Sequence, residues 1–125
     1  MEISLERPDD FLYVRRVEND AVTVVDRRFT RSLVLARNRV IENWPVSNAS
    51  CLEPADIEPI LALSPEVVLL GTGHSQRFPP SNTLHAFLAA DIGVEVMDNH
   101  AAARTYAVLA GEGRNVVVAF ILESQ

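Results

Sequence analysis

Two uninterrupted apolar runs constrain the fold of this 125-residue chain more than any other feature. Residues Val67 to Leu70 and Val116 to Leu122 carry no polar side chain, so both faces of a strand built from either run must be covered. Neither run approaches the roughly 18 apolar residues that a membrane-spanning helix needs. Strands buried on both faces occur in parallel or mixed sheets with helices packed on them, so the runs predict an α/β fold.

The chain beyond residue 53 alternates helical and extended patterns. Apolar residues recur at i, i+3 and i+4 in a first segment, where Asp56 is expected to cap a helix and to leave Pro59 in its first turn. Similar periodicity and an Ala-rich segment predict two further helices. The predicted elements are a helix around 57–61, a strand over 67–70, a helix around 84–88, a strand over 94–97, a helix over 101–110 ended by Gly111, and a strand over 116–122.

The first third of the chain contains short extended segments separated by polar turn signals. Aromatic and β-branched residues favour strands there, and Pro45 ends the pattern. The predicted strands cover 11–17, 21–25, 29–36 and 40–44, which form a β-meander. The predicted fold is therefore α/β: a single three-layer α/β/α domain over residues 1–125 with a mixed central β-sheet, in which the meander precedes an α-β-α-β-α-β series.

Charge and residue usage exclude several functional classes. The formal net charge is −6, which opposes the phosphate backbone, so no nucleic-acid partner is expected. All 11 basic residues are Arg, so no Lys can form a Schiff base, anchor pyridoxal phosphate or bind phosphate in a Walker loop. Cys51 is the single cysteine, and Met1 to Ser4 lack the features of a secretory signal. We therefore expect a soluble, cytoplasmic protein that is not transmembrane.

A glycine-rich turn after the first apolar run is the first candidate for a ligand site. Gly71, Thr72 and Gly73 follow a predicted strand and precede a loop and a helix, which is the topology in which backbone N–H groups bind an anion. Gln76 stands where the dinucleotide-binding fingerprint has its third glycine. A structural tight turn is the alternative interpretation.

Asp98 and Arg104 extend this candidate site. Asp98 follows a predicted strand, where it could either cap the next helix or face a ligand beside the glycine turn. Arg104 is unusual on a helix of small apolar residues, so it could bind an anion or form a structural ion pair with Asp98 or Glu112.

Residues for catalysis or metal binding are sparse. His74, His85 and His100 show no zinc-ligand spacing, so no metal is expected. Cys51 and His74 would need a third group that the sequence does not suggest, and no nucleophile elbow is present. No residue is assigned a catalytic role and no cofactor is expected. Whether the chain is an enzyme stays open, with a non-catalytic role favoured.

An ordered set of short motifs resembles one known family. The set consists of Val67 to Gly73, Met97-Asp98, Arg104-Thr105-Tyr106 and Glu112-Gly113-Arg114 before the apolar final run. It resembles the small domain of unknown function found in archaeal and bacterial proteins and in mitochondrial complex I assembly factor 3. The resemblance implies a three-layer α/β/α fold with a mixed sheet and, for the mitochondrial relatives, a role in building respiratory complex I.

The sequence departs from that family at three positions on and before the third predicted helix. Asn99, Ala103 and Ala107 replace the Thr, Cys and Asn that the family commonly has there. Thiol chemistry at this helix is therefore absent.

Two functional hypotheses follow. The first is a non-catalytic protein-binding or assembly module, with a respiratory or membrane-complex subunit as partner. The alternative is a small-molecule or anion-binding domain, which could be an enzyme, with its site at Gly71, Thr72, Gly73, Asp98 and Arg104. Self-association is a further hypothesis beside these two.

Overall fold

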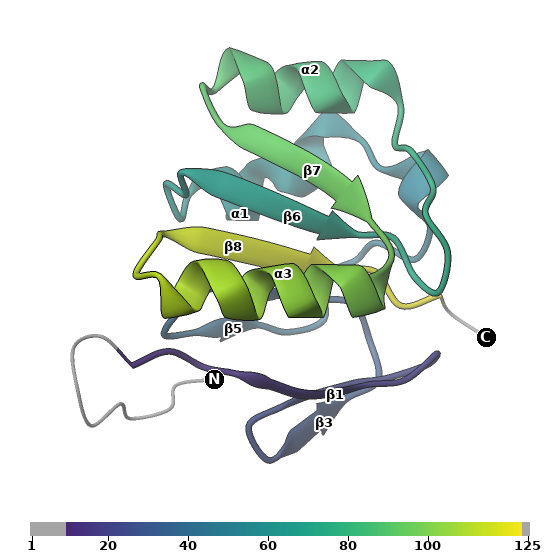
Figure 1. Ribbon diagram of the computed structural model, residues 1–125. Coiled ribbons are helices and arrows are strands. Elements are labelled where there is room, and N and C mark those ends of the chain that lie inside the picture. Colours follow the sequence, from purple (N-terminus) through teal and green to yellow (C-terminus); the bar gives the residue numbers. More distant parts are fainter. Residues whose placement is uncertain (1–9, 124–125) are drawn as a thin grey trace.

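A mixed five-stranded sheet forms the centre of the molecule. The structure, a computed structural model, describes residues 10–123 (Figure 1), so Met1 to Ser4, considered above as a signal, lie outside the described residues. The strand order is β5-β4-β8-β6-β7. Strand β6 pairs in parallel with β7 and β8, whereas β4 pairs antiparallel with β8 and β5. The bounds are β4 Leu33–Leu35, β5 Val40–Ile41, β6 Val67–Gly71, β7 Gly93–Met97 and β8 Val116–Phe120.

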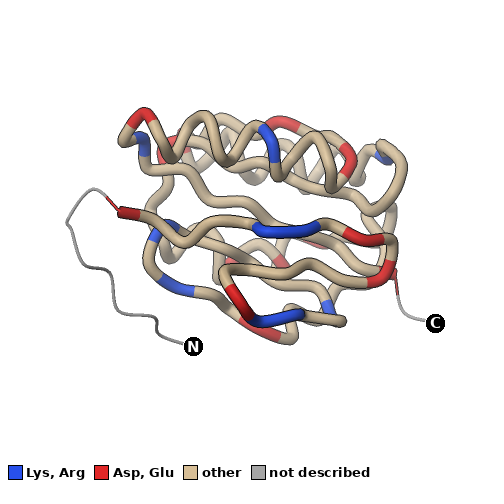
Figure 2. Tube along the Cα trace, turned by 60° about the horizontal axis from the view of Figure 1, so that its bottom comes forward, with Lys and Arg blue, Asp and Glu red and all other residues tan. Residues whose placement is uncertain are grey.

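One face of this sheet is covered by a helix and by a second, smaller sheet. Helix α3 (Asn99–Gly111) and the antiparallel strands β1 (Val14–Val17), β2 (Val22–Val24) and β3 (Arg27–Phe29) pack there around one core cluster. The Tyr106 hydroxyl donates to the Leu12 carbonyl oxygen over 2.6 Å and joins α3 to the chain before β1. Figure 2 brings the small sheet forward and shows basic and acidic positions interspersed along it.

The opposite face carries the remaining helices. The 3₁₀ turns η1 (Ala49–Cys51) and η2 (Pro54–Ile57), the short helix α1 (Glu58–Leu61) and helix α2 (Ser81–Ala89) surround a second core cluster. In β8, Val116, Val118 and Phe120 belong to the first cluster, while Val117 and Ala119 belong to the second. This alternation confirms that both faces of the apolar run are covered, and with it the predicted α/β/α layers and mixed sheet.

The predicted meander is wrong in one respect: it is divided between the two sheets. The predicted strand over 29–36 breaks at residues 30–32, because Ser32 turns inward there. Its buried hydroxyl donates to the Val46 carbonyl oxygen and accepts a 2.8 Å hydrogen bond from the Leu122 N–H. The chain consequently leaves β3 of the small sheet and enters β4 of the central sheet.

Two helix boundaries also differ from the prediction. The Asp56 carboxylate accepts the Glu53 N–H over 2.8 Å inside η2, so it does not cap α1, although Pro59 does lie in the first turn of α1. Gly111 remains inside α3, and the left-handed glycine is Gly113, with φ of 80°. Gly113 has the conformation that follows a helix end, so it serves the role predicted for Gly111.

Strands β6, β7 and β8 run in the same direction and end at one edge of the sheet, which we call the carboxyl edge. The connection from β6 to β7 passes through α2 on one face, and the connection from β7 to β8 passes through α3 on the other. Strand β8 lies on the opposite side of β6 from β7. The ends of β6 and β8 therefore flank a topological switch point, where open α/β sheets tend to bind ligands.

Candidate functional site

The glycine turn lies at this switch point. The Gly71 carbonyl oxygen accepts the Ile121 N–H over 2.9 Å, which extends the pairing of β6 and β8 past the end of β8. The Thr72 N–H donates to the Met97 carbonyl oxygen over 2.9 Å, which joins the turn to the end of β7. Gly73 then adopts φ of 104°, a left-handed conformation that favours glycine. The turn thus contacts both neighbouring strands.

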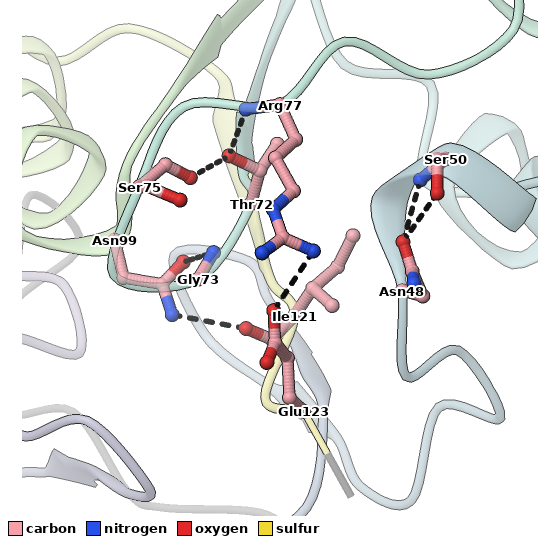
Figure 3. Close-up of polar contacts among 9 residues, drawn as sticks. All are labelled: Asn48, Ser50, Thr72, Gly73, Ser75, Arg77, Asn99, Ile121 and Glu123. Carbon is pink, nitrogen blue, oxygen red and sulfur yellow. Dashed lines mark hydrogen bonds and ion pairs between the residues drawn. The ribbon is translucent and has the colours of Figure 1, made fainter.

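Asn99, the first residue of α3, fills the space between the two strand ends. Its Oδ1 accepts the Gly73 N–H over 3.2 Å, and its Nδ2 donates to the Ile121 carbonyl oxygen over 3.0 Å (Figure 3). The residue is 2% exposed. A Cβ on Gly71 would lie 2.4 Å from Asn99 Oδ1, so the close approach of this side chain requires glycine at position 71. In the sequence Asn99 stands out only as a departure from the family pattern, and nothing local predicts this role.

The segment after the turn, residues 74–80, has no helix or strand, yet its conformation is fixed by contacts; we call it the braced loop. The Thr72 hydroxyl donates to the Ser75 carbonyl oxygen over 2.7 Å and accepts the Arg77 N–H over 3.0 Å (Figure 3). The Gln76 Nε2 donates to the Val96 carbonyl oxygen of β7 over 3.0 Å. Side-chain contacts therefore hold the loop to the sheet on two sides.

An ion pair adds a third attachment of the braced loop. The Arg77 Nη1 lies 3.3 Å from the Glu123 Oε1 just beyond β8, and both side chains are 44% exposed. Figure 3 shows the Arg77 guanidinium extending past Thr72 toward Glu123. An exposed pair of this kind contributes little to stability by itself. The sequence did not predict a role for either residue, because an Arg and a Glu 46 positions apart carry no local signal.

The braced loop exposes an aromatic side chain. Phe78 is 63% exposed, whereas the following residue, Pro79, is buried and anchors the backbone beside it. Large apolar side chains of this exposure are few in the described chain, and the others are Tyr13, Leu88 and Val108. Only Phe78 belongs to an irregular segment held by side-chain hydrogen bonds at the carboxyl edge.

Asp98 caps α3, as one of the two sequence interpretations expected. Its Oδ1 accepts the Ala101 N–H over 2.9 Å. The adjacent Asn99 N–H donates to the Gly73 carbonyl oxygen over 2.8 Å, which places Asp98 next to the glycine turn. The structure thus brings Gly71, Thr72, Gly73 and Asp98 together at the carboxyl edge.

Arg104 lies apart from these residues. It is exposed on α3, about 9 Å along the helix axis from Asp98, as six residues of α-helix imply. Within residues 10–123 it forms no ion pair with Asp98 or Glu112, so the structural pair suggested by the sequence is not observed. An anion could reach both Arg104 and the turn only by extending along the helix.

Several N–H groups that an anion would use at this edge already have partners. Those of Thr72 and Gly73 donate to Met97 and Asn99, and that of Arg77 donates to Thr72. At the start of α3, the Ala101 N–H is used by the Asp98 carboxylate. The turn is therefore organised by the chain's own polar groups, which favours its structural interpretation.

The side chains with a clearly shifted pKa, Tyr106 and Arg28, lie away from the carboxyl edge. Burial raises the pKa of the Tyr106 hydroxyl, and the nearby Arg37 charge offsets the effect in part. The exposed Arg28 guanidinium has a raised pKa chiefly because it donates to Glu18.

Between residues 10 and 123, no group of three His, Cys, Asp or Glu side chains has the arrangement of a metal site. None of the helices in that range is both long and apolar enough to cross a bilayer.

Comparisons with known proteins agree with the fold. A 13 kDa major membrane protein of Francisella tularensis subsp. holarctica is 30% identical over 89 residues, which cover 70% of this chain and 72% of that protein. The NMR structure of a Xanthomonas campestris protein has a TM-score of 0.83 and 42% identity over 98% of this chain and 92% of that chain.

A further solved structure connects the fold with a described domain type. The NMR structure of a Bordetella pertussis protein, described as a Mth938-like domain, has a TM-score of 0.81 and 27% identity, covering all of this chain (100%) and 94% of that one. The sequence profile described as "Protein of unknown function (DUF498/DUF598)" matches residues 14–121. With this match and the fold it accompanies, the chain belongs to the DUF498/DUF598 family of proteins of unknown function.

Proposed function

We propose that this chain is a non-catalytic protein-binding module whose partner is a subunit of a membrane-associated complex. The observation that carries the proposal is Phe78, 63% exposed on the braced loop. Aromatic side chains supply much of the binding energy at protein interfaces. An aromatic residue presented by a well-fixed loop is suited to that role.

The contacts of the braced loop support this role energetically. Ordering a flexible side chain or loop at an interface costs about 0.5–1.5 kcal/mol for each immobilised side chain. In this chain Thr72, Gln76 and Arg77 already fix the backbone just before Phe78, through contacts within the loop, with β7 and with Glu123. Little of that cost would therefore remain to be met on binding.

The proposed class of partner rests on relatives. The Francisella relative is named a major membrane protein. The motif set in the sequence resembles a family that includes mitochondrial complex I assembly factor 3, and this resemblance suggests the same class of partner. The proposed attachment to the membrane is peripheral and runs through the partner. A cytoplasmic location, on the surface of such a complex, belongs to the same proposal.

Affinity capture tests the proposal. The tagged chain is used as bait for detergent-solubilised membranes and, separately, for the soluble fraction of its own cells. A matched control exists in Leu88→Ala, since Leu88 is 68% exposed but lies on α2. Parent and Leu88→Ala are expected to enrich the same membrane-complex subunits, and Phe78→Ala to recover at least ~10-fold less, as loss of an interface anchor implies. Equal recovery with Phe78→Ala would count against the proposal.

The alternative function, a small-molecule or anion-binding site, is favoured by the position of the glycine turn at the switch point. The ligand would contact Gly71, Thr72, Gly73 and Asp98, and a ligand that extends along α3 would also contact Arg104. Inorganic phosphate and sulfate are the probes, followed by amide NMR. Saturable shifts at Gly73 and Ala101 that weaken in Arg104→Gln would support it, and shifts confined to exposed arginines would argue for unspecific ion association instead.

A further inference from the structure

A pocket of about 560 Å³ opens where the small sheet meets the central sheet, just beyond the end of β8. Residues from four parts of the chain line it: Asp20 from the β1–β2 turn, residues 30–32 from the link between the sheets, residues 44–47 after β5, and residues 122–123 after β8. Its volume falls within the range of about 300–1,000 Å³ that is usual for small-molecule sites. None of the residues considered above as an anion site lines it.

The floor of the pocket is preformed. The buried Ser32 hydroxyl joins the Val46 carbonyl oxygen to the Leu122 N–H, and these contacts hold two walls together. Trp44 lines the pocket and is 3% exposed. The Trp44 indole Nε1 donates to the Asp56 carbonyl oxygen over 2.9 Å, and the Trp44 backbone N–H donates to the Ser32 carbonyl oxygen over 2.9 Å. A ligand would therefore meet fixed walls and need not order them.

Charges of both signs lie at the mouth. Arg31 is exposed, and within residues 10–123 no ion pair involves it. Asp20 lies 3.4 Å from Arg28 Nη2, and Glu123 lies 3.3 Å from Arg77 Nη1, with all four side chains substantially exposed. Exposed pairs of this kind are weak, so both carboxylates keep the capacity to accept hydrogen bonds from a ligand.

We infer that this pocket binds a small zwitterion, with the chemistry of a free amino acid or short peptide. Arg31 offers the forked donor that a carboxylate accepts in two parallel hydrogen bonds. Asp20 and Glu123 offer acceptors for an ammonium group. A simple anion would be repelled by the two carboxylates and a simple cation by Arg31, so a ligand carrying both charges matches the pocket best.

The test uses leucine and glycylleucine as probes, each also in N-acetylated and C-amidated form. Trp44 is the only tryptophan, so its indole N–H gives a single NMR resonance within the pocket wall. Either free zwitterion is expected to shift that resonance saturably at millimolar concentration. Each blocked form is expected to bind at least ~10-fold more weakly, as loss of one charge-assisted contact implies. If leucine binds more tightly than glycylleucine, the ligand is a free amino acid; the reverse order of affinity indicates a short peptide.

Variants assign the contacts. Arg31→Gln should abolish the preference for the free carboxylate over the amide, and Glu123→Gln should reduce the preference for the free amine. Arg39→Gln and Glu95→Gln change exposed residues that do not line the pocket and should leave both preferences intact. The inference is overturned if neither probe shifts Trp44, if the blocked forms bind as tightly, or if Arg31→Gln has no effect while its spectrum stays native.

Discussion

Replacing Asn99 with Ala is expected to lower the free energy of unfolding by about 2–4 kcal/mol. The side chain satisfies the Gly73 N–H and the Ile121 carbonyl group, and all three residues are buried. A buried polar group left without a partner costs about 1–3 kcal/mol, and two such groups arise here. Water entering the vacated space would bring the cost toward the lower end. For a chain of this size, about 2–4 kcal/mol corresponds to a fall in Tm of about 8–16 °C.

Urea unfolding followed by Trp44 fluorescence measures this change, because the single tryptophan is buried in the second core cluster. Asn82→Ala is the control, since Asn82 is exposed on α2 and should change stability by less than about 0.5 kcal/mol. Asn99→Asp retains the acceptor for Gly73 but loses the donor to Ile121, so it should also destabilise. An Asn99→Ala protein as stable as the Asn82→Ala control would refute the bridging role assigned to Asn99.

Three other predictions concern the same fold. Gly71→Ala should destabilise by about 1–3 kcal/mol in calorimetry, because its Cβ would lie 2.4 Å from Asn99 Oδ1; an unchanged Tm would contradict the close packing. Asp98→Ala should cost about 1 kcal/mol in urea unfolding through loss of the α3 cap, while Asp98→Asn should retain most of the stability. Burial raises the pKa of Tyr106 above its unfolded value of 10.0, so its contribution to stability is complete below pH 10 and lost as pH rises further. The stability of the parent should therefore fall more steeply than that of Tyr106→Phe above pH 10, and parallel curves would contradict this.

The layers of the fold follow from local pattern because each strand and helix must hide a particular face. The all-apolar run of β8 requires cover on both sides, and its alternate residues do enter the two core clusters. The break at residues 30–32 could not be predicted in this way. It depends on the contacts of Ser32 with Val46 and Leu122, which lie 14 and 90 residues away.

In the candidate site too, features set by local sequence could be predicted, and features set by distant residues could not. The glycine turn and the cap at Asp98 are local patterns, and both could be predicted to lie next to each other at a strand edge. The bridge made by Asn99 depends on partners 26 and 22 residues away, and the bracing of residues 74–80 depends on Val96 and Glu123. Only tertiary structure brings such partners together, so neither feature has a sequence signature.

Site-specific photo-crosslinking most directly tests protein binding through the braced loop. Benzoylphenylalanine is placed at position 78, and in a second chain at position 88, where the side chain is similarly open to solvent but on α2. After irradiation of cells, position 78 is expected to yield a discrete adduct with a membrane-complex subunit in the membrane fraction, and position 88 is expected to yield none. The absence of an adduct at position 78, or the same adducts from both positions, would contradict binding through the loop.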